Sequence, residues 1–508
     1  MNSRWKNSLY AAVASACLIG ALAPASAAGT LLIAREADST TFDPIATQQN
    51  PDCWIYPNIF AGLVKADVGG TKIEPSLAES WTTSPDGLTY TFKLRPGLKF
   101  SDGSPIKASD VRFSILRARD TKESAWNSLY TGIADVIPKD DATVVITLKA
   151  ASSVFLANIA MFAAVVLPEA AMTKMGEEAF AQKPVVSGAF MVDEWKHGDR
   201  VILKKNPNYW NASHVSLDRV EWIIVANDNT RILKLQAKEV DAAIILPFNR
   251  VAELQKTPGL AVHLDPSTRE DFMIMNEAHK PFDNVDVRKA INMALDRKAI
   301  VDAVTFGIGE VANSFLSKGA PFYNPGNKDY AYDLAAAKAL MQKAGVASAK
   351  AGLLITAGDS SHEQMAVLMK DQLAKIGVEL VVTKKEQGQA FDTITAGDYD
   401  LAIQYWTNDI IDPDEKTAFS VYGDDTNKSF YTTYKNAEVT KLVDDSRTEL
   451  DAAKRTVIYN KIQQIVKDDA QWVDLFYSPY RNVTASYVKN FTQNPLGGFT
   501  LEDTTIEK

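Results

Sequence analysis

Residues 405–414 combine aromatic and acidic side chains that could bind a cation. Trp406 is followed three residues later by Asp409, and Asp412 and Asp414 come soon after. A carboxylate that leaves water needs a charged or hydrogen-bonding partner, and an indole ring offers apolar and cation–π contact. Acid-rich loops also form turns and helix caps, so a structural role stays open for Asp409 and Trp406 and is favoured for the other two acids.

The element that must position these side chains is a strand over 399–406. Tyr399, Leu401, Ile403 and Tyr405 alternate with other residues, which is the period of a strand with one buried face. The loop after it reads Thr-Asn-Asp. In open α/β sheets, ligands bind beyond the carboxyl ends of strands. The loop is therefore placed where such a sheet would hold a ligand.

No catalytic motif of comparable strength appears in the chain. It lacks a G-x-S-x-G elbow, a P-loop and an H-E-x-x-H motif. The histidines, at 197, 214, 263, 279 and 362, show no metal-ligand spacing. We therefore expect no enzyme activity, no metal and no cofactor. An extracytoplasmic hydrolase stays an alternative, because two carboxylates can meet in a fold without a sequence motif.

The N-terminus has the three parts of a secretory signal. Two basic residues precede an apolar run over 9–22, and Ala-Ser-Ala at 25–27 forms a cleavage site. We expect removal of residues 1–27 and a periplasmic location. A membrane anchor is disfavoured because the run is shorter than the ~20 residues that a span needs. Lipidation is disfavoured because Cys17 lies inside the run.

Length and composition indicate a soluble protein with more than one lobe. A chain of 508 residues is too long for a single core. The net charge of −9 argues against nucleic acid as a partner. Cys53 is the one cysteine outside the signal, which excludes an internal disulfide, and we expect a packed thiol and a monomer.

The second half of the chain alternates helices and strands. A strand at 353–356, a helix at 362–376 and a strand at 378–383 form a βαβ unit, which implies a parallel pair. Asp333 is placed to cap a helix that ends at Gly345. Further strands are expected at 143–149, 188–195, 200–205, 220–225, 242–246 and 472–477, and further helices from 230, at 287–295 and at 453–467.

Residues 74–113 carry the most distinctive pattern. They read Glu-Pro-Ser-Leu-Ala-Glu-Ser-Trp from Glu74, Ser-Pro-Asp-Gly-Leu-Thr-Tyr-Thr-Phe-Lys-Leu-Arg-Pro-Gly from Ser84, and Ala-Ser-Asp-Val-Arg-Phe from Ala108. The alternation over 88–94 predicts a strand, and the last segment predicts a helix start. The block resembles the signature of the peptide/nickel-type (family 5) solute-binding proteins of bacterial ABC importers. Similar landmarks run to about residue 480.

The resemblance implies an α/β fold with two lobes around a ligand cleft. Lobe I would comprise 28–268 and 481–508, enlarged by a subdomain at about 56–186, and lobe II would comprise 269–480. The chain would then cross between the lobes twice and form a hinge. Hinge closure around a ligand is the documented motion of periplasmic binding proteins.

The resemblance also implies ligand contacts in the loop after the 399–406 strand. In peptide-binding members, the acid of Trp-x-x-Asp holds the ligand ammonium and the aromatic residue lines the peptide, which assigns these roles to Asp409 and Trp406. The remaining candidate ligand-binding residues are their neighbours and two residues of an early polar loop, namely Tyr405, Thr407, Asn408, Thr47 and Gln48. Dipeptide-binding members carry an arginine for the ligand carboxylate at 357–362, but no basic side chain other than His362 is present there.

We therefore expect the periplasmic binding component of an ABC importer that captures peptides, with oligopeptides favoured, and docks on a cognate inner-membrane permease. The missing arginine leaves a cationic non-peptide solute as an alternative. A chaperone on the same fold is a further alternative. Nickel and haem, which the wider family transports, receive no support because no histidine cluster is present.

Overall fold

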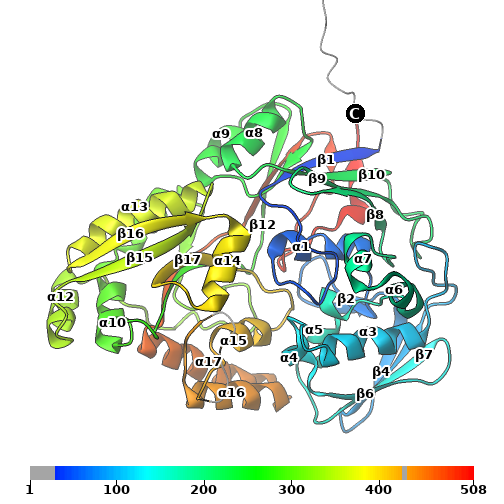
Figure 1. Ribbon diagram of the computed structural model, residues 1–508, viewed down its shortest axis with the longest axis horizontal. Helices are drawn as coiled ribbons and strands as arrows, with labels where there is room; N and C mark the ends of the chain where they lie inside the picture. Colours follow the sequence, from blue (N-terminus) through cyan, green and yellow to red (C-terminus); the bar gives the residue numbers. More distant parts are fainter. Residues whose placement is uncertain (1–28, 426–428, 430–431) are drawn as a thin grey trace, which may run out of the picture.

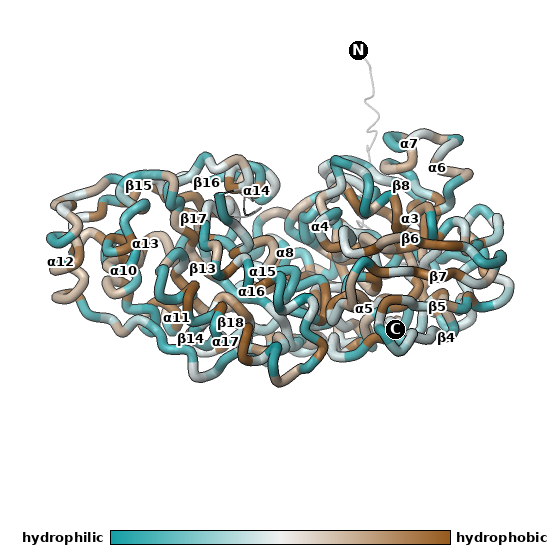
Figure 2. Tube along the Cα trace, turned by 90° about the horizontal axis from the view of Figure 1, so that it is seen from below, coloured by the Kyte–Doolittle hydropathy of each residue, from teal (hydrophilic) through white to brown (hydrophobic). Residues whose placement is uncertain are grey.

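The computed structural model describes residues 29–425, 429 and 432–508, which fold into two lobes (Figure 1). The predicted signal peptide lies outside the described residues. Each lobe is built around a mixed sheet with helices packed on it, and hydrophobic residues gather inside both lobes (Figure 2). The two-lobed α/β fold expected from the sequence is thereby confirmed.

The sheet of lobe I has seven strands in the order β12-β19-β11-β1-β10-β9-β8. Its central strand β1 runs parallel to β10 and β11, and the hairpin β8–β9 extends one edge. The bounds are β1 Thr30–Arg35, β8 Phe190–Lys196, β9 Arg200–Lys205, β10 Arg219–Ile224, β11 Ala242–Ala243, β12 Leu260–Asp265 and β19 Tyr480–Ala485. The shorter elements are α1 Asn50–Cys53, α2 Tyr56–Ile59, α8 Asp228–Gln236, η2 Phe248–Arg250, α9 Val251–Leu254, η3 Leu501–Asp503, β2 Val64–Ala66, β3 Ile73–Pro75, β20 Val488–Lys489 and β21 Thr505–Ile506.

Strand β11 is shorter than the 242–246 segment predicted from sequence. Ile245 has a left-handed backbone, with φ of 55°. Its carbonyl and that of Ile244 accept hydrogen bonds from the Arg231 guanidinium at 3.1 and 3.0 Å. The segment leaves the ladder because the buried Arg231 side chain, instead of a neighbouring strand, satisfies these carbonyls.

A separate four-stranded sheet, in the order β4-β5-β7-β6, enlarges lobe I. The predicted strands at 88–94 and 143–149 are confirmed as β5 and β7. The predicted helix is confirmed as α3, where Asp110 accepts the Lys107 N–H at 2.9 Å and so caps the first turn. The bounds are β4 Ala78–Thr83, β5 Thr89–Leu94, β6 Ile133–Pro138, β7 Thr143–Leu148, α3 Ala108–Asp120, α4 Asn127–Tyr130, α5 Phe155–Ile159, η1 Phe162–Ala164, α6 Glu169–Met175 and α7 Glu177–Gln182.

The sheet of lobe II has six strands in the order β14-β18-β13-β17-β15-β16. The predicted βαβ unit is confirmed, since β15 and β16 pair in parallel and α13 connects them. Asp333 caps α12 by accepting the Ala336 N–H at 2.9 Å. The bounds are β13 Glu270–Met275, β14 Glu310–Val311, β15 Ala349–Thr356, β16 Val378–Lys385, β17 Leu401–Trp406, β18 Trp472–Tyr477, α10 Val285–Ala294, α11 Arg297–Thr305, α12 Leu334–Lys343, α13 Ser360–Ala374, α14 Gln387–Ala396, α15 Asp414–Ser420, α16 Ala437–Thr448 and α17 Ala452–Asp469.

Strand β17 is more deeply buried than its alternating sequence indicates. It lies inside the sheet between β13 and β15, and five of its six residues are buried. A central strand covered by helices on both faces needs no polar face. The carboxyl end of β17 opens into the loop that carries Asp409.

The chain passes between the two sheets at 266–269 and at 478–479. The Ser267 hydroxyl joins these two segments by donating to the Ser478 carbonyl at 2.5 Å. Strand β13 follows the first crossing, and β19 follows the second. The lobe limits that we propose, 268/269 and 480/481, therefore fall beside these crossings, and the second falls one residue inside β19.

Candidate functional site

Two adjoining cavities lie between the lobes, each of about 50 Å³. One, the tryptophan pocket, is bounded by Gln48, Gln49 and Asn50 from lobe I and by Gln387, Tyr405, Trp406 and Asp409 from lobe II. The other, the arginine pocket, is bounded by Glu36, Asp228, Arg231 and Arg481 from lobe I and by Arg269, Asp359, Gln387 and Tyr405 from lobe II. Because they share Gln387 and Tyr405, the two cavities form one cleft.

Asp409 lines the tryptophan pocket and forms an acid pair with Glu415. Glu415 lies in the first turn of α15 and accepts the backbone N–H groups of Asp409 and Ile410, at 2.6 and 3.2 Å. Burial raises the pKa of Asp409 to about 8 and raises that of Glu415 well above its ordinary value. Two carboxyl groups that share one buried site cannot both ionise, so the pair retains a proton. Within the described residues, no basic side chain forms an ion pair with Asp409.

Trp406 and Tyr405 line the same cleft at the end of β17. Trp406 is 7% exposed and stacks on Phe419 with ring centroids 6.1 Å apart. Tyr405 lies beneath Arg269, whose guanidinium carbon is 3.7 Å from the ring centroid, and accepts a hydrogen bond from Gln387 at 3.3 Å. Both side chains therefore line the cleft.

Thr407 and Asn408 fix the loop between the hinge and lobe I. The Asn408 N–H donates to the Thr268 hydroxyl at 2.8 Å, which ties the loop to the first crossing segment. The Thr407 hydroxyl donates to Asn50 across the cleft at 3.4 Å. Thr407 lines the tryptophan pocket, whereas Asn408 is buried behind it.

Of the two candidates in lobe I, Gln48 reaches the cleft and Thr47 does not line it. The Gln48 amide donates to the Ala125 carbonyl at 2.8 Å, while its buried oxygen has no hydrogen-bond partner in the described part of the chain. Thr47 is buried, and its hydroxyl donates to Asp52 at 2.9 Å. Gln48 therefore offers a free acceptor, and Thr47 stabilises the segment behind it.

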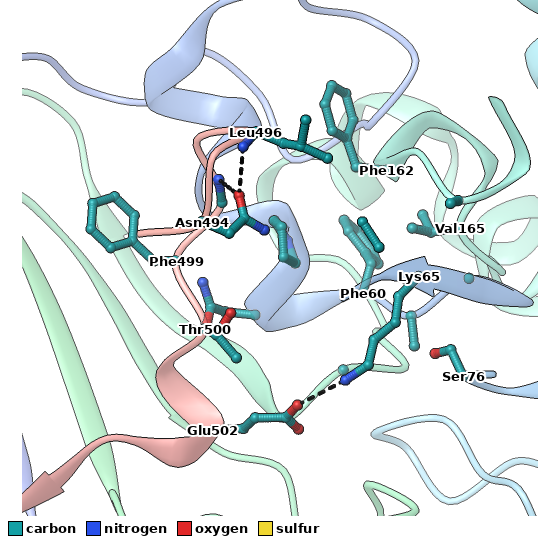
Figure 3. A pocket seen from close by; sticks show the side chains of 18 of the residues that line it. Phe60, Lys65, Ser76, Phe162, Val165, Asn494, Leu496, Phe499, Thr500 and Glu502 are labelled. Atoms are coloured by element: carbon teal, nitrogen blue, oxygen red, sulfur yellow. Dashed lines mark hydrogen bonds and ion pairs between the residues drawn. The ribbon is translucent and has the colours of Figure 1, made fainter. Parts of the chain in front are cut away.

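A third cavity, of about 160 Å³, lies inside lobe I and reaches Asp409 from the other side. Its walls include Phe60, Phe162, Val165, Leu496 and Phe499, and the Lys65–Glu502 ion pair of 3.2 Å stands at its rim (Figure 3). We call it the lobe I cavity. No sequence pattern indicated this cavity, because residues such as Phe60, Phe162 and Leu496 come from distant parts of the chain.

The other acids of the loop make ion pairs within lobe II. Asp412 forms a two-bond pair with Arg455, at 2.8 and 3.0 Å, and Asp414 accepts Arg447 at 2.7 Å. Asp412 also accepts the Asp414 N–H at 3.0 Å, as a turn residue would. These two carboxylates hold the loop and α15 against α16 and α17.

The 357–362 segment has a structural role that accounts for its composition. Asp359 caps α13 by accepting the N–H groups of Ser361 and His362, at 2.8 and 3.1 Å. The Ser360 hydroxyl donates to Asp228 of lobe I at 2.6 Å and so joins the lobes. Arginines at 231, 269 and 481 instead line the arginine pocket, and the sequence pattern did not single them out.

Other kinds of site find no support in the described residues. Over 29–425, 429 and 432–508, no group of three His, Cys, Asp or Glu side chains could hold a metal ion. None of the helices in that part of the chain has the length and apolar character of a membrane span. Cys53 is buried and free, and burial raises the pKa of its thiol.

Comparison with known proteins gives relatives over nearly the whole chain. The glutathione-binding protein GsiB of Escherichia coli O6:K15:H31 is 30% identical, with 95% of this chain and 96% of the relative aligned. The di/tripeptide-binding protein 1 of Pseudomonas aeruginosa is 29% identical over 98% of this chain and 97% of the relative.

Solved structures of binding proteins also superpose on this chain over nearly its whole length. The ABC transporter-associated periplasmic binding protein DppA of Helicobacter pylori, in complex with the peptide STSA, superposes with a TM-score of 0.86 at 28% identity, covering 95% of this chain and 98% of that one. AgaA of A. tumefacien R10, in complex with agropinic acid, has a TM-score of 0.85 at 27% identity, covering 94% and 99%.

The profile of the bacterial extracellular solute-binding proteins, family 5, matches residues 72–428, which is more than half of the chain. That match includes the 74–113 block and the strand and loop that carry Trp406 and Asp409. The chain therefore belongs to the family 5 extracellular solute-binding proteins, the substrate-binding proteins of ABC transporters.

Proposed function

We propose that this protein captures peptides in the periplasm, holds their N-terminal ammonium at Asp409, and delivers them to the membrane permease of an ABC importer. The observation that carries the proposal is the Asp409–Glu415 pair, of which Asp409 lines both the cleft and the lobe I cavity. A buried carboxylate without a cationic partner is costly, and a ligand ammonium is the partner it lacks.

The surrounding side chains suit the first residue of a peptide. With the ammonium on Asp409, the Trp406 face can cover the adjoining peptide unit, and the free oxygen of Gln48 can accept one of its N–H groups. The first side chain would enter the lobe I cavity between Phe60 and Phe162. The ammonium, the first peptide unit and the first side chain of the ligand would each contact a protein group of complementary chemistry.

Closure would follow from contacts made by both lobes. Hydrogen bonds already cross the cleft from Thr407 to Asn50 and from Ser360 to Asp228. A ligand shifts the lobes toward this closed arrangement only if it binds the closed form better than the open one. A peptide that contacts Asp409 and Gln48 at once meets this requirement, because the two residues belong to different lobes.

Binding of trialanine and N-acetyl-trialanine, measured by isothermal titration calorimetry on the mature protein, tests the ammonium site. We expect trialanine to bind and the acetylated peptide to bind at least 100-fold more weakly. Equal affinity for the two peptides would refute the role of Asp409. Native mass spectrometry on gently purified protein would identify the natural ligand that co-purifies. The mass of the complex would also show whether the protein is a monomer.

A small non-peptide solute is the second candidate. The cavities between the lobes are small, at about 50 Å³ each, and the related AgaA has been solved with agropinic acid. A single non-peptide mass in the native spectrum would keep the transport role and move the substrate to this class. A ladder of peptide masses would exclude it.

A further inference from the structure

The arginine pocket contains a carboxylate that the fold leaves without a partner. Glu36 follows the end of β1, and both oxygens of its carboxylate are buried with no hydrogen-bond partner in the described part of the chain. Two of the other three acids of the pocket are satisfied, since Asp228 accepts from Ser360 at 2.6 Å and Asp359 caps α13. The third, Glu386, is exposed just before α14. Glu36 is therefore the acid of this pocket whose two carboxylate oxygens are both buried and both free to accept hydrogen bonds from a ligand.

Three guanidinium groups line the same pocket, and they differ in their hydrogen-bond and ion-pair partners. Arg269 makes a two-bond ion pair with Asp271, at 2.7 and 2.8 Å. Arg231 donates to four backbone carbonyls around β10 and β11. Arg481 donates from Nε to the Leu246 carbonyl at 2.9 Å and from Nη1 to the hinge residues 478 and 479.

Arg481 is the guanidinium that still has a free hydrogen-bond donor. Among the described residues it has no carboxylate within ion-pair distance, and its Nη2 has no acceptor. Burial and the nearby Arg269 lower its pKa to about 9, so an anion beside it would be stabilised. The side chain also stacks over Phe248, with 3.5 Å between the guanidinium carbon and the ring centroid, which fixes its orientation.

We propose that Glu36 and Arg481 form a second ligand subsite, which binds the carboxyl end of a peptide whose last residue is basic. Arg481 would take the terminal carboxylate through Nη2, and Glu36 would take the side-chain ammonium. The subsite replaces the arginine that is missing from 357–362, and it rests on the proposed peptide function. The shared Gln387 and Tyr405 connect it to the ammonium site at Asp409.

The geometry favours a basic residue over a plain carboxyl end. A terminal carboxylate alone would satisfy Arg481 and leave Glu36 buried without a partner, which costs free energy. A cation alone would satisfy Glu36 and leave Arg481 unmatched. Only a group that carries both charges pairs both side chains at once.

Alanine peptides of two to five residues that end in lysine, norleucine or lysine amide test the subsite by calorimetry on the mature protein. Norleucine keeps the carbon chain of lysine without its charge, and the amide removes the carboxylate. We expect the lysine peptide of the best length to bind at least tenfold tighter than either relative. In Glu36→Gln the preference for lysine over norleucine should disappear, while the penalty for the amide remains.

Arg481 also donates to backbone carbonyls, so Arg481→Lys is used only if its circular dichroism spectrum matches that of the unaltered protein. In this variant, the loss of affinity caused by replacing the terminal carboxylate with an amide should become smaller. The lysine amide peptide probes the same contact on the unaltered protein. Equal binding of lysine and norleucine peptides, still abolished by Asp409→Asn, would overturn the subsite and leave the proposed function intact. If none of the peptides binds, both fail together.

Discussion

Peptide binding at Asp409 should release a proton. The pKa of Asp409 is raised to about 8 by burial, so its carboxyl is mostly protonated at pH 6.5 in the ligand-free protein. An ammonium needs the carboxylate, and removing the proton at 1.5 units below the pKa costs about 2 kcal/mol, or about 30-fold in affinity. Affinity should therefore rise between pH 6.5 and 8. Above this range it should fall, since a peptide α-amino group loses its charge near a pKa of about 7.7–8.0.

The assay is titration of trialanine into the protein at pH 6.5 in phosphate and in bis-Tris, which both buffer at this pH and whose ionisation enthalpies differ. A difference in apparent binding enthalpy gives the number of protons released, and we expect about one. Asp409→Asn should release none and should bind about 30- to 4,000-fold more weakly, because losing one partner of a buried charged hydrogen bond costs about 2–5 kcal/mol.

Two further variants separate the acid pair from a general effect of charge. In Glu415→Gln, the amide oxygen can still accept the N–H groups of Asp409 and Ile410, while its NH₂ group donates to Asp409. Because burial still raises the pKa of Asp409 and position 415 still donates a hydrogen bond to it, the pKa should stay raised, and the pH profile should keep its position without loss of binding. Asp398→Asn, at an exposed acid of the same lobe, should change nothing. Trialanine binding that releases no proton and keeps one affinity from pH 6 to 8 would refute the reasoning.

Three other predictions concern specificity and stability. Leu-Ala-Ala should bind about 10- to 100-fold tighter than Asp-Ala-Ala by calorimetry, because burying leucine in the lobe I cavity gains about 1.5–3 kcal/mol and an aspartate would meet Asp409; the reverse order would remove the cavity from the site. Gly188→Ala should lower the free energy of unfolding in urea by about 1–3 kcal/mol, since the added Cβ would lie 2.5 Å from the Ile59 carbonyl carbon and 2.7 Å from the Phe60 nitrogen. Lys416→Met should cost about 3–5 kcal/mol in the same assay, because it leaves the buried Glu270 without its ion-pair partner. The double variant Glu270→Gln/Lys416→Met should recover part of that loss, and no recovery would contradict the pairing.

Much of the local structure could be predicted from the sequence. The alternation over 88–94, the cap at Asp333 and the βαβ unit ending at 383 were all confirmed, with boundaries shifted by a few residues. Each depends on side chains and backbone groups that are close in the sequence. The prediction for 242–246 was wrong in length because arginines from distant elements bind its carbonyls.

The candidate site, too, could be predicted from the sequence only in part. The sequence placed Trp406 and Asp409 in a loop at the carboxyl end of a strand, and the structure puts both against the cleft. The sequence could not show that Glu415 lies beside Asp409, because the packing of α15 brings them together. The same packing buries both carboxyl groups and so raises their pKa values. Thr47 shows the converse, since its polar type indicated the cleft but its hydroxyl turns to Asp52.

The sequence by itself determined the family and the position of the acidic loop, since these follow from local patterns in the chain, and the resemblance to the family implied the two-lobed fold. Only the tertiary structure decided which charges meet in the cleft. Glu36, Arg269 and Arg481 are separated by more than 200 residues in each direction, and the two hinge crossings bring them to one pocket. Which of those charges are paired depends on the distances between their atoms, and spacing along the chain carries no information about those distances.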